Sequence, residues 1–289
     1  MAVQIKEKET AGQKRRVWIL PVVAIGLVWI SVIALYVFGR SSPMNKLLAS
    51  NAAVMTGDSS YTVPAASAAH GTDHAIAFTD PGVESRVRLY LNRPDGEIFC
   101  SDVWELRYID IRADRIIFLE KPSSGDSFTV NGSYGAENQI VTDTTLPPIC
   151  SLEDFQWFDS LQVLQINMNR ISGVWEPLTQ LSGPEKCENL TVMRLYNISP
   201  DDFDAVGNMR GLKMLSLNCY GSISLDARAL EELKELEYLS LTNIRVENAA
   251  PLTELEALHS VRLYNCESSA NAEENWGKIF PVAEELSVR

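Results

Sequence analysis

Cysteine and histidine are scarce in this sequence, which narrows the chemistry that the chain can perform. It holds five cysteines and three histidines among 289 residues. The cysteines stand at irregular spacing and form no CxxC pair, so we expect neither a disulfide scaffold nor a zinc site. His70 and His74 lie in a polar segment, which leaves His259 as the one histidine of the later, repetitive region. We therefore expect no catalytic residues, no metal and no cofactor.

Positively charged residues are also few relative to acidic ones. Lys and Arg total 25 against 38 Asp and Glu, for a net charge of −13. Residues 1–16 carry five Lys or Arg against two Glu, or +3, which leaves −16 for the remainder. Such an excess argues against nucleic acid or anionic lipid as a partner of the folded part.

A long apolar run occurs once, from Val17 to Phe38, with 22 residues and no charge. As a helix it measures about 33 Å, against a hydrocarbon core of ~30 Å. Lys14, Arg15 and Arg16 directly precede it, so the positive-inside rule predicts that residues 1–16 form a cytosolic tail. The sequence thus predicts a single-pass protein of the plasma membrane with an extracytoplasmic head. The alternative, a cleaved signal peptide, has an apolar region of only ~7–15 residues.

Residues 39–75 are rich in Ser, Ala and Gly and lack sustained periodicity. This composition is typical of a flexible stalk. Fully extended, the stalk reaches only about 120–130 Å, so we expect the head to stay close to the membrane.

The folded part is predicted from one stretch, residues 236–258. Leu239 and Leu241 alternate with Tyr238 and Ser240, the period of a half-buried strand. Every third residue is then leucine from position 252 to 258, as on one turn of helix. The pattern L-x-x-L-x-L recurs at spacings of 29, 22, 24 and 22 residues, starting at Leu161, Leu190, Leu212, Leu236 and Leu258. One strand and one short helix cannot close a core alone, so the units are predicted to stack as a solenoid.

These repeats resemble the leucine-rich-repeat family. The resemblance extends to the internalin-like N-terminal cap of bacterial members, through the run F-x-D-P-x-x-E-x-x-V-R-x-x-L-N-x-P-x-G-x-I. That run is carried here by Phe78, Asp80, Pro81, Glu84, Val87, Arg88, Leu91, Asn92, Pro94, Gly96 and Ile98. The family implies an α/β solenoid with parallel strands on a concave face and short helical returns. It places a cap at residues 76–105 and the repeats at 106–289.

The ninth repeat position departs from the family, which usually has Asn or Cys there. The residues in this position are Asn169, Ile198, Tyr220, Ile244 and Cys266. The resemblance therefore implies no continuous asparagine ladder.

Two stretches leave alternatives open. Leu106, Ile109, Ile111 and Ile116 predict a degenerate first repeat, and the 55 residues between Leu106 and Leu161 hold either a loop insertion or one more hidden repeat. The acidic run 199–204 is predicted to begin a helix, with a serine N-cap followed by proline, in preference to a calcium site.

Two strands share the tetrapeptide Arg-Leu-Tyr-Asn, and their side chains opposite the leucines form the candidate site. The predicted partner-binding residues are Arg194, Tyr196, Asn197, Met214, Tyr238, Arg262, Tyr264 and Asn265. Tyr and Arg are enriched at binding hot spots, although β-propensity alone also explains tyrosine on a solvated strand face. We expect a protein partner near the membrane or cell surface, and little effect of these tyrosines on folding. A structural scaffold of the cell envelope is the alternative; an envelope hydrolase is disfavoured because no region outside the repeats can house a catalytic set.

Cys219 and Cys266 are predicted to be unpaired. Two strand steps separate their α-carbons by about 10 Å, beyond the ~7 Å that a disulfide permits. With Cys266 facing the core and Cys219 at the concave edge, Cys219 is expected to react first with a thiol reagent.

Overall fold

The computed structural model describes most of the predicted head. The residues described are 62–63, 70–112, 115–119, 128–129, 140–141, 146–167, 177–268, 276–280 and 285–288. The predicted cytosolic tail and membrane span, and most of the predicted stalk, lie outside these ranges. Within them, no helix is long and apolar enough to cross a membrane. The chain divides into two units, residues 1–59 and 60–289, and the second is described below.

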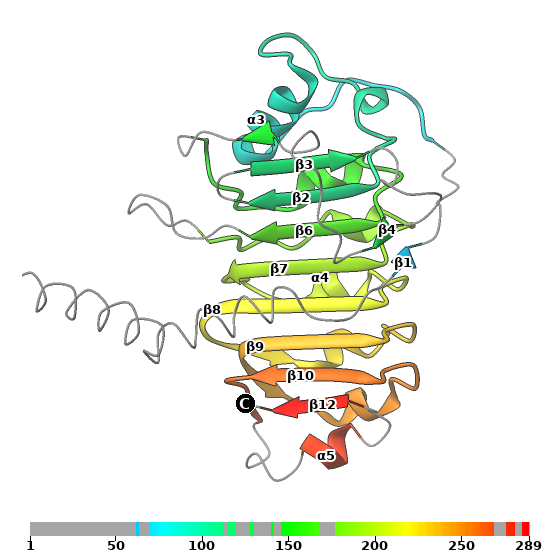
Figure 1. The fold of residues 1–289 in the computed structure, drawn as a ribbon, viewed down its shortest axis with the longest axis vertical. Coiled ribbons are helices and arrows are strands. Elements are labelled where there is room, and N and C mark those ends of the chain that lie inside the picture. The colour runs from blue at the N-terminus through cyan, green and yellow to red at the C-terminus, as the bar shows by residue number, and fades with distance from the viewer. Residues whose placement is uncertain are drawn as a thin grey trace, which may run out of the picture. The chain divides into compact units, whose positions relative to one another are not determined.

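A single row of parallel strands forms the body of this unit (Figure 1). Each repeat contributes one strand, and each pairs with the strand of the next repeat in parallel register. In spatial order they are β2 (Tyr108–Arg112), β6 (Val163–Asn167), β7 (Val192–Ile198), β8 (Met214–Asp226), β9 (Tyr238–Glu247), β10 (Ser260–Tyr264) and β12 (Glu285–Val288). The predicted solenoid and its last strand are confirmed.

The region between the first two repeats is an insertion and not a hidden repeat. β2 bonds directly to β6, so no further repeat stands between them. After β2 the chain turns back into β3 (Arg115–Leu119), which is antiparallel to β2 and pairs with β5 (Ile140–Val141). Ile116 therefore belongs to this returning strand and not, as its spacing suggested, to the strand of the first repeat.

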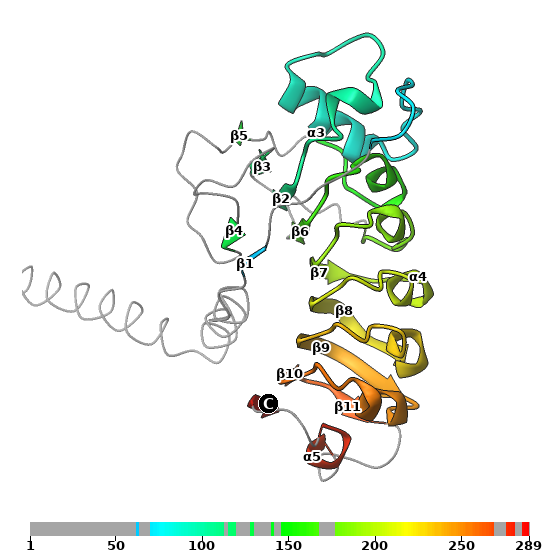
Figure 2. The same cartoon turned by 90° about the vertical axis from the view of Figure 1, so that its right-hand side faces the viewer.

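Short helices cover one face of the sheet (Figure 2). They are η3 (Glu153–Trp157), η4 (Pro184–Lys186), α4 (Asp204–Gly207), η5 (Ala227–Leu230) and η6 (Ala250–Glu254). Most are 3-10 turns, as a leucine at every third residue predicts. Neighbouring helices pack closely: a β-carbon on Gly207 would lie 2.1 Å from the carbonyl oxygen of Ala229.

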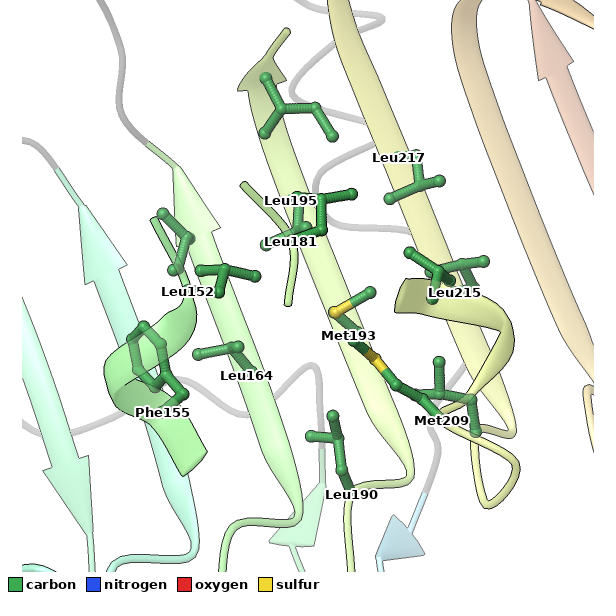
Figure 3. Close-up of a cluster of buried hydrophobic side chains, with 14 of the residues drawn as sticks. Leu152, Phe155, Leu164, Leu181, Leu190, Met193, Leu195, Met209, Leu215 and Leu217 are labelled. Atoms are coloured by element: carbon green, nitrogen blue, oxygen red, sulfur yellow. The ribbon is translucent and has the colours of Figure 1, made fainter. Parts of the chain in front are cut away.

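Between the sheet and these helices lies one apolar core (Figure 3). The first leucine of every repeat is at most 2% exposed. The strand leucines at the fourth and sixth positions, such as Leu239 and Leu241, point to the same side and are fully buried. We call this the core face of the sheet and the opposite side its outer face.

The cap covers the first repeat with α3 (Pro81–Leu91). As predicted, Asp80 caps this helix, since its Oδ1 accepts the amides of Gly82 and Val83. Its other oxygen accepts the amides of Cys150 and Ser151, which ties the helix to the start of the second repeat. η1 (Cys100–Asp102) follows, and the cap's apolar side chains join the core.

The acidic run 199–204 differs from its prediction. Ser199 caps nothing; its amide donates to the Leu178 carbonyl. α4 begins only at Asp204, whose amide donates a hydrogen bond to Asp202 Oδ1 at 3.1 Å. The remaining elements are a two-residue strand pair, β1 (Thr62–Val63) with β4 (Phe128–Thr129), a short β11 (Glu267–Ser268) beside β9, and α5 (Trp276–Ile279).

Candidate binding face

The outer face carries its side chains in rows that run across the strands, because the parallel register aligns equivalent repeat positions. The third-position row is Tyr108, Val163, Val192, Met214, Tyr238 and Ser260. The fifth-position row is Asp110, Gln165, Arg194, Ser216, Ser240 and Arg262. The seventh-position row is Arg112, Asn167, Tyr196, Asn218, Thr242 and Tyr264.

The third-position row forms a second apolar cluster instead of a solvated surface. Met214 is 1% exposed and Tyr238 is 6% exposed, and both pack with Tyr108, Val163 and Val192. The expectation that tyrosines on this face lie outside any core is therefore wrong for Tyr238. The sequence concealed this because a valine or tyrosine at a strand position fits equally well with a solvated face.

The two Arg-Leu-Tyr-Asn strands lie in different surroundings. Arg194 and Tyr196 of the first are only 4% and 3% exposed, and burial raises the pKa of the Tyr196 hydroxyl. The guanidinium of Arg194 donates to the Met214 sulfur at 3.0 Å. In the second strand, Arg262 and Tyr264 are half-buried. The two identical tetrapeptides therefore differ in how far their side chains are exposed to solvent.

At the carboxyl end of the stack, side chains of the candidate set reach solvent. Arg262 lies over the Tyr238 ring, with its guanidinium carbon 5.5 Å from the ring centroid. Tyr264 is the next outer-face side chain along β10, and Asn265 follows it and is exposed. These three residues combine a cation, an aromatic ring and an amide on one exposed strand end.

Asparagines at the eighth repeat position form a ladder that sequence reasoning missed. Asn197, Asn243 and Asn265 all have left-handed backbone, with φ of 59°, 58° and 50°. Asn265 Nδ2 donates to Asn243 Oδ1 at 2.8 Å, and Asn243 Nδ2 donates to the carbonyl of Cys219 at 2.9 Å. In the sequence these asparagines stand one position earlier than the asparagine of the family pattern. Asparagine suits this place because it tolerates positive φ better than other non-glycine residues.

The repeat that begins at Leu212 has no asparagine at its eighth position, and its strand falls out of register with β7 there. Cys219 pairs with Ile198 and takes the buried ninth-position place, where Tyr220 was predicted. Tyr220 is instead 53% exposed, in a bulge between Asn218 and Ile223 that uses Gly221 at a φ of 80°. The spacing of 24 residues in this repeat, against 22 in the next, was the available sign of the bulge.

Tyr220 therefore joins the exposed end of the outer face. Together with Arg262, Tyr264 and Asn265 it forms a group spread over β8 to β10, which we call the rim surface. Adjacent strands lie about 4.8 Å apart, so the rim surface spans on the order of 10 Å.

Cys219 and Cys266 are not bonded to each other, as predicted, since each holds a thiol and no disulfide. Cys219 is only 1% exposed, so its predicted place at an accessible edge is wrong. Burial raises the pKa of the Cys187 and Cys219 thiols to about 12.

The described ranges contain no group of three or more His, Cys, Asp or Glu side chains arranged to hold a metal ion. A hollow in these ranges lies between η5 and η6, has a volume near 430 Å³ and is lined partly by Glu231, Glu232 and Glu254. It lies on the helical side of the sheet, away from the rim surface.

The strand-and-turn unit, its period and its parallel register define a class of architecture: a capped solenoid of parallel strands and short helical returns, built on leucine-spaced repeats. No protein-family model matches the sequence, and no curated protein matches it. Among solved structures, the chain is similar to internalin C2 of Listeria monocytogenes, with 13% identity and a TM-score of 0.30 over 73% of this chain and 94% of that one.

Proposed function

We propose that the head is a protein-binding module and that the rim surface contacts its partner. The carrying observation is the exposed end of the outer face, where Arg262 and Tyr264 of β10 and Tyr220 of β8 reach solvent. Arginine and tyrosine supply large contact areas, and the tyrosine ring and hydroxyl come at low conformational cost. In a head with a charge excess of −16, a local cation favours a partner that presents carboxylates.

Six of the eight candidate residues fall into two groups within this proposal. Arg262, Tyr264 and Asn265 would touch the partner, whereas Arg194, Met214 and Tyr238 would shape the sheet beneath it. A solenoid suits such a role because its stacked strands present an extended surface.

The test compares partner recovery by the full chain and by an Arg262→Glu/Tyr264→Ala variant. We expect at least about a tenfold loss of affinity, the size of a modest hot-spot contribution. Arg210→Glu is the matched control, because Arg210 is 72% exposed on the turn before β8. Equal losses for both variants would point to bulk charge and not to the rim surface.

Within the same proposal, residues 17–38 anchor the protein in the plasma membrane and the head lies outside. The apolar span and the cations before it support this arrangement. Protease added to intact cells should remove the head and leave a membrane-bound remnant. A head that is digested only after lysis would place it on the cytosolic side.

A further inference from the structure

Residues 70–75, just before the cap, lie against it, although their composition predicts a free stalk. The Asp73 carboxylate accepts both the amide and the hydroxyl of Ser101, each at 2.9 Å. The amide of Cys100 donates to the His74 carbonyl at 3.0 Å. The segment is thus held to the cap by backbone and side-chain hydrogen bonds, and none of these involves a strand of the repeats.

His70 begins this docked segment, and its ring lies on an aromatic side chain of the cap. The ring stacks on Trp104, with centroids 4.4 Å apart and planes 13° apart. Two carboxylates lie at the edge of the ring: Glu105 Oε1 is 2.9 Å from Nε2, and Asp159 Oδ2 is 3.6 Å from Nδ1. We call the indole and the two carboxylates the Trp104 site. Its occupant is only 24% exposed.

The Trp104 site belongs to the folded cap and repeats and does not need the docked segment to form. Trp104 packs against the core, and its carbonyl accepts the amide of Ser160 at 3.0 Å. The carbonyl of Asp159 accepts Asn189 Nδ2 at 3.1 Å. These contacts fix the backbone at both sides of the site, so the site should persist when residues 70–75 leave it.

His70 uses only part of what the site offers. A carboxylate only accepts hydrogen bonds, so Nε2 donates to Glu105. Nδ1 is buried and has no hydrogen-bond partner in the described part of the chain. Asp159 Oδ2 therefore receives no hydrogen bond from the ring, and accepts instead the amide of Gly71 at 3.4 Å.

A guanidinium group matches the site more completely than an imidazole does. It is planar and stacks on an aromatic ring, and its five N–H donors can reach both carboxylates at once. It is also a cation, which suits a surface that presents two acidic side chains. An arginine side chain thus satisfies the indole, Glu105 and Asp159 together.

The docked segment is able to leave the cap without unfolding the repeats. Residues 71–75 are exposed, and the first residue of the core is Ile76, at 9% exposure. A segment that buries little apolar surface opens at a small fraction of the free energy of global unfolding. Its departure would uncover the Trp104 site.

We propose that the Trp104 site binds an arginine side chain from an extended segment of a partner protein. In the unbound protein, residues 70–75 fill the site as a displaceable plug. The plug supplies the layout of the partner segment: arginine at the place of His70 and an acidic residue three positions later, where Asp73 meets Ser101. This site lies on the cap, and it depends neither on a partner at the rim surface nor on a membrane anchor.

Fluorescence anisotropy of labelled peptides, titrated with the full chain in detergent, tests the proposal. Two peptides carry the sequence of residues 70–78, with the first residue replaced by Arg in one and by Ala in the other. The His70→Ala chain, whose plug lacks its ring, should bind the Arg peptide at least about tenfold more tightly than the Ala peptide. The wild-type chain should bind the Arg peptide about fivefold more weakly than His70→Ala does, because the plug competes.

Two further variants, made in the His70→Ala chain, locate the binding. Glu105→Gln with Asp159→Asn keeps the shape of both side chains and should abolish the preference for the Arg peptide. Asp95→Asn with Glu97→Gln is the matched control, because it makes the same change of charge at two exposed residues after α3. This control should keep the preference.

Equal binding of the two peptides by the His70→Ala chain would overturn the site, as would no binding of either. A wild-type chain that binds the Arg peptide as tightly as His70→Ala would contradict the plug. A preference that the Asp95 and Glu97 variant loses to the same extent would assign the effect to bulk charge and also overturn the proposal.

Discussion

Asn265 Nδ2 donates to Asn243 Oδ1 at 2.8 Å, from one left-handed residue to the equivalent one in the preceding repeat. Each repeat must leave its strand at this point, and the positive φ makes the turn. The side-chain amide then satisfies polar groups that the turn would otherwise expose within the stack. The ladder thus combines a backbone requirement with a hydrogen-bond requirement in one residue type.

This dual role predicts different costs for two substitutions at Asn243. Asn243→Ala loses the hydrogen bonds to the Cys219 carbonyl and from Asn265, and alanine tolerates left-handed backbone less well than asparagine, for about 2 kcal/mol of unfolding free energy. Asn243→Gly loses the same hydrogen bonds without the backbone strain and should cost about 1 kcal/mol. Urea unfolding of both variants measures the difference. Equal costs would show that positive φ carries no strain here.

Tyr238 is predicted to be structural, in contrast to Tyr264. Because Tyr238 is 6% exposed and packs in the second apolar cluster, Tyr238→Ala should lower the unfolding free energy by about 3 kcal/mol. Tyr264→Ala, on the half-buried strand end, should cost less than about 1 kcal/mol. Chemical denaturation of the two variants side by side provides the comparison. Similar losses would mean that the outer face is packed uniformly.

Thiol reactivity should follow burial. Cys187 and Cys219 have pKa values raised to about 12, so near pH 8 almost none of either thiol is the reactive thiolate. Cys150 and Cys266 are only partly buried and should be alkylated first. Mass spectrometry of folded protein after brief alkylation gives the order. Early modification of Cys219 would place its repeat in another register.

Asp110 should weaken the fold as pH rises. It is fully buried on β2, and burial raises the pKa of its carboxyl despite hydrogen bonds from Arg112. A raised pKa means that the native state favours the protonated form, so this contribution is present in acid and is lost as pH climbs through the folded value. Asp110→Asn does not titrate and should therefore gain stability relative to wild type as pH rises above about 4, the ordinary pKa of the carboxyl. An opposite trend in paired unfolding curves would show that the ion pair with Arg112 dominates.

The sequence predicted the core better than the surface, for physical reasons. Leucine spacing is sufficient for the core, because a leucine such as Leu239 has one favourable place and a one-residue slip would expose it. The outer face has no such rule: Tyr238 and Tyr264 occupy strands of the same type, yet one is packed and the other reaches solvent. Only the tertiary surroundings separate them.

The structure also differs from the predictions where one sequence pattern is compatible with two structures. Ile116 has strand spacing, but spacing cannot tell a parallel strand from a returning one. His70 lies in a run of small polar residues, and its stacking on Trp104 depends on a partner 34 positions away. The asparagines at the eighth position could be read from the sequence. Their ladder could not be predicted, because it depends on a positive φ that the sequence does not show.

The exposed end of the outer face is the surface that we propose meets a protein partner. A photoreactive amino acid placed in turn at positions 264, 220 and 234 of the full chain tests it most directly, in the cells that carry the protein. Lys234 serves as the reference, because it is exposed beside the acidic hollow on the helical side. We predict that positions 264 and 220 crosslink to the same protein and that position 234 does not. Crosslinking at 234 with none at 264 would contradict the claim and move the binding surface to the helical side.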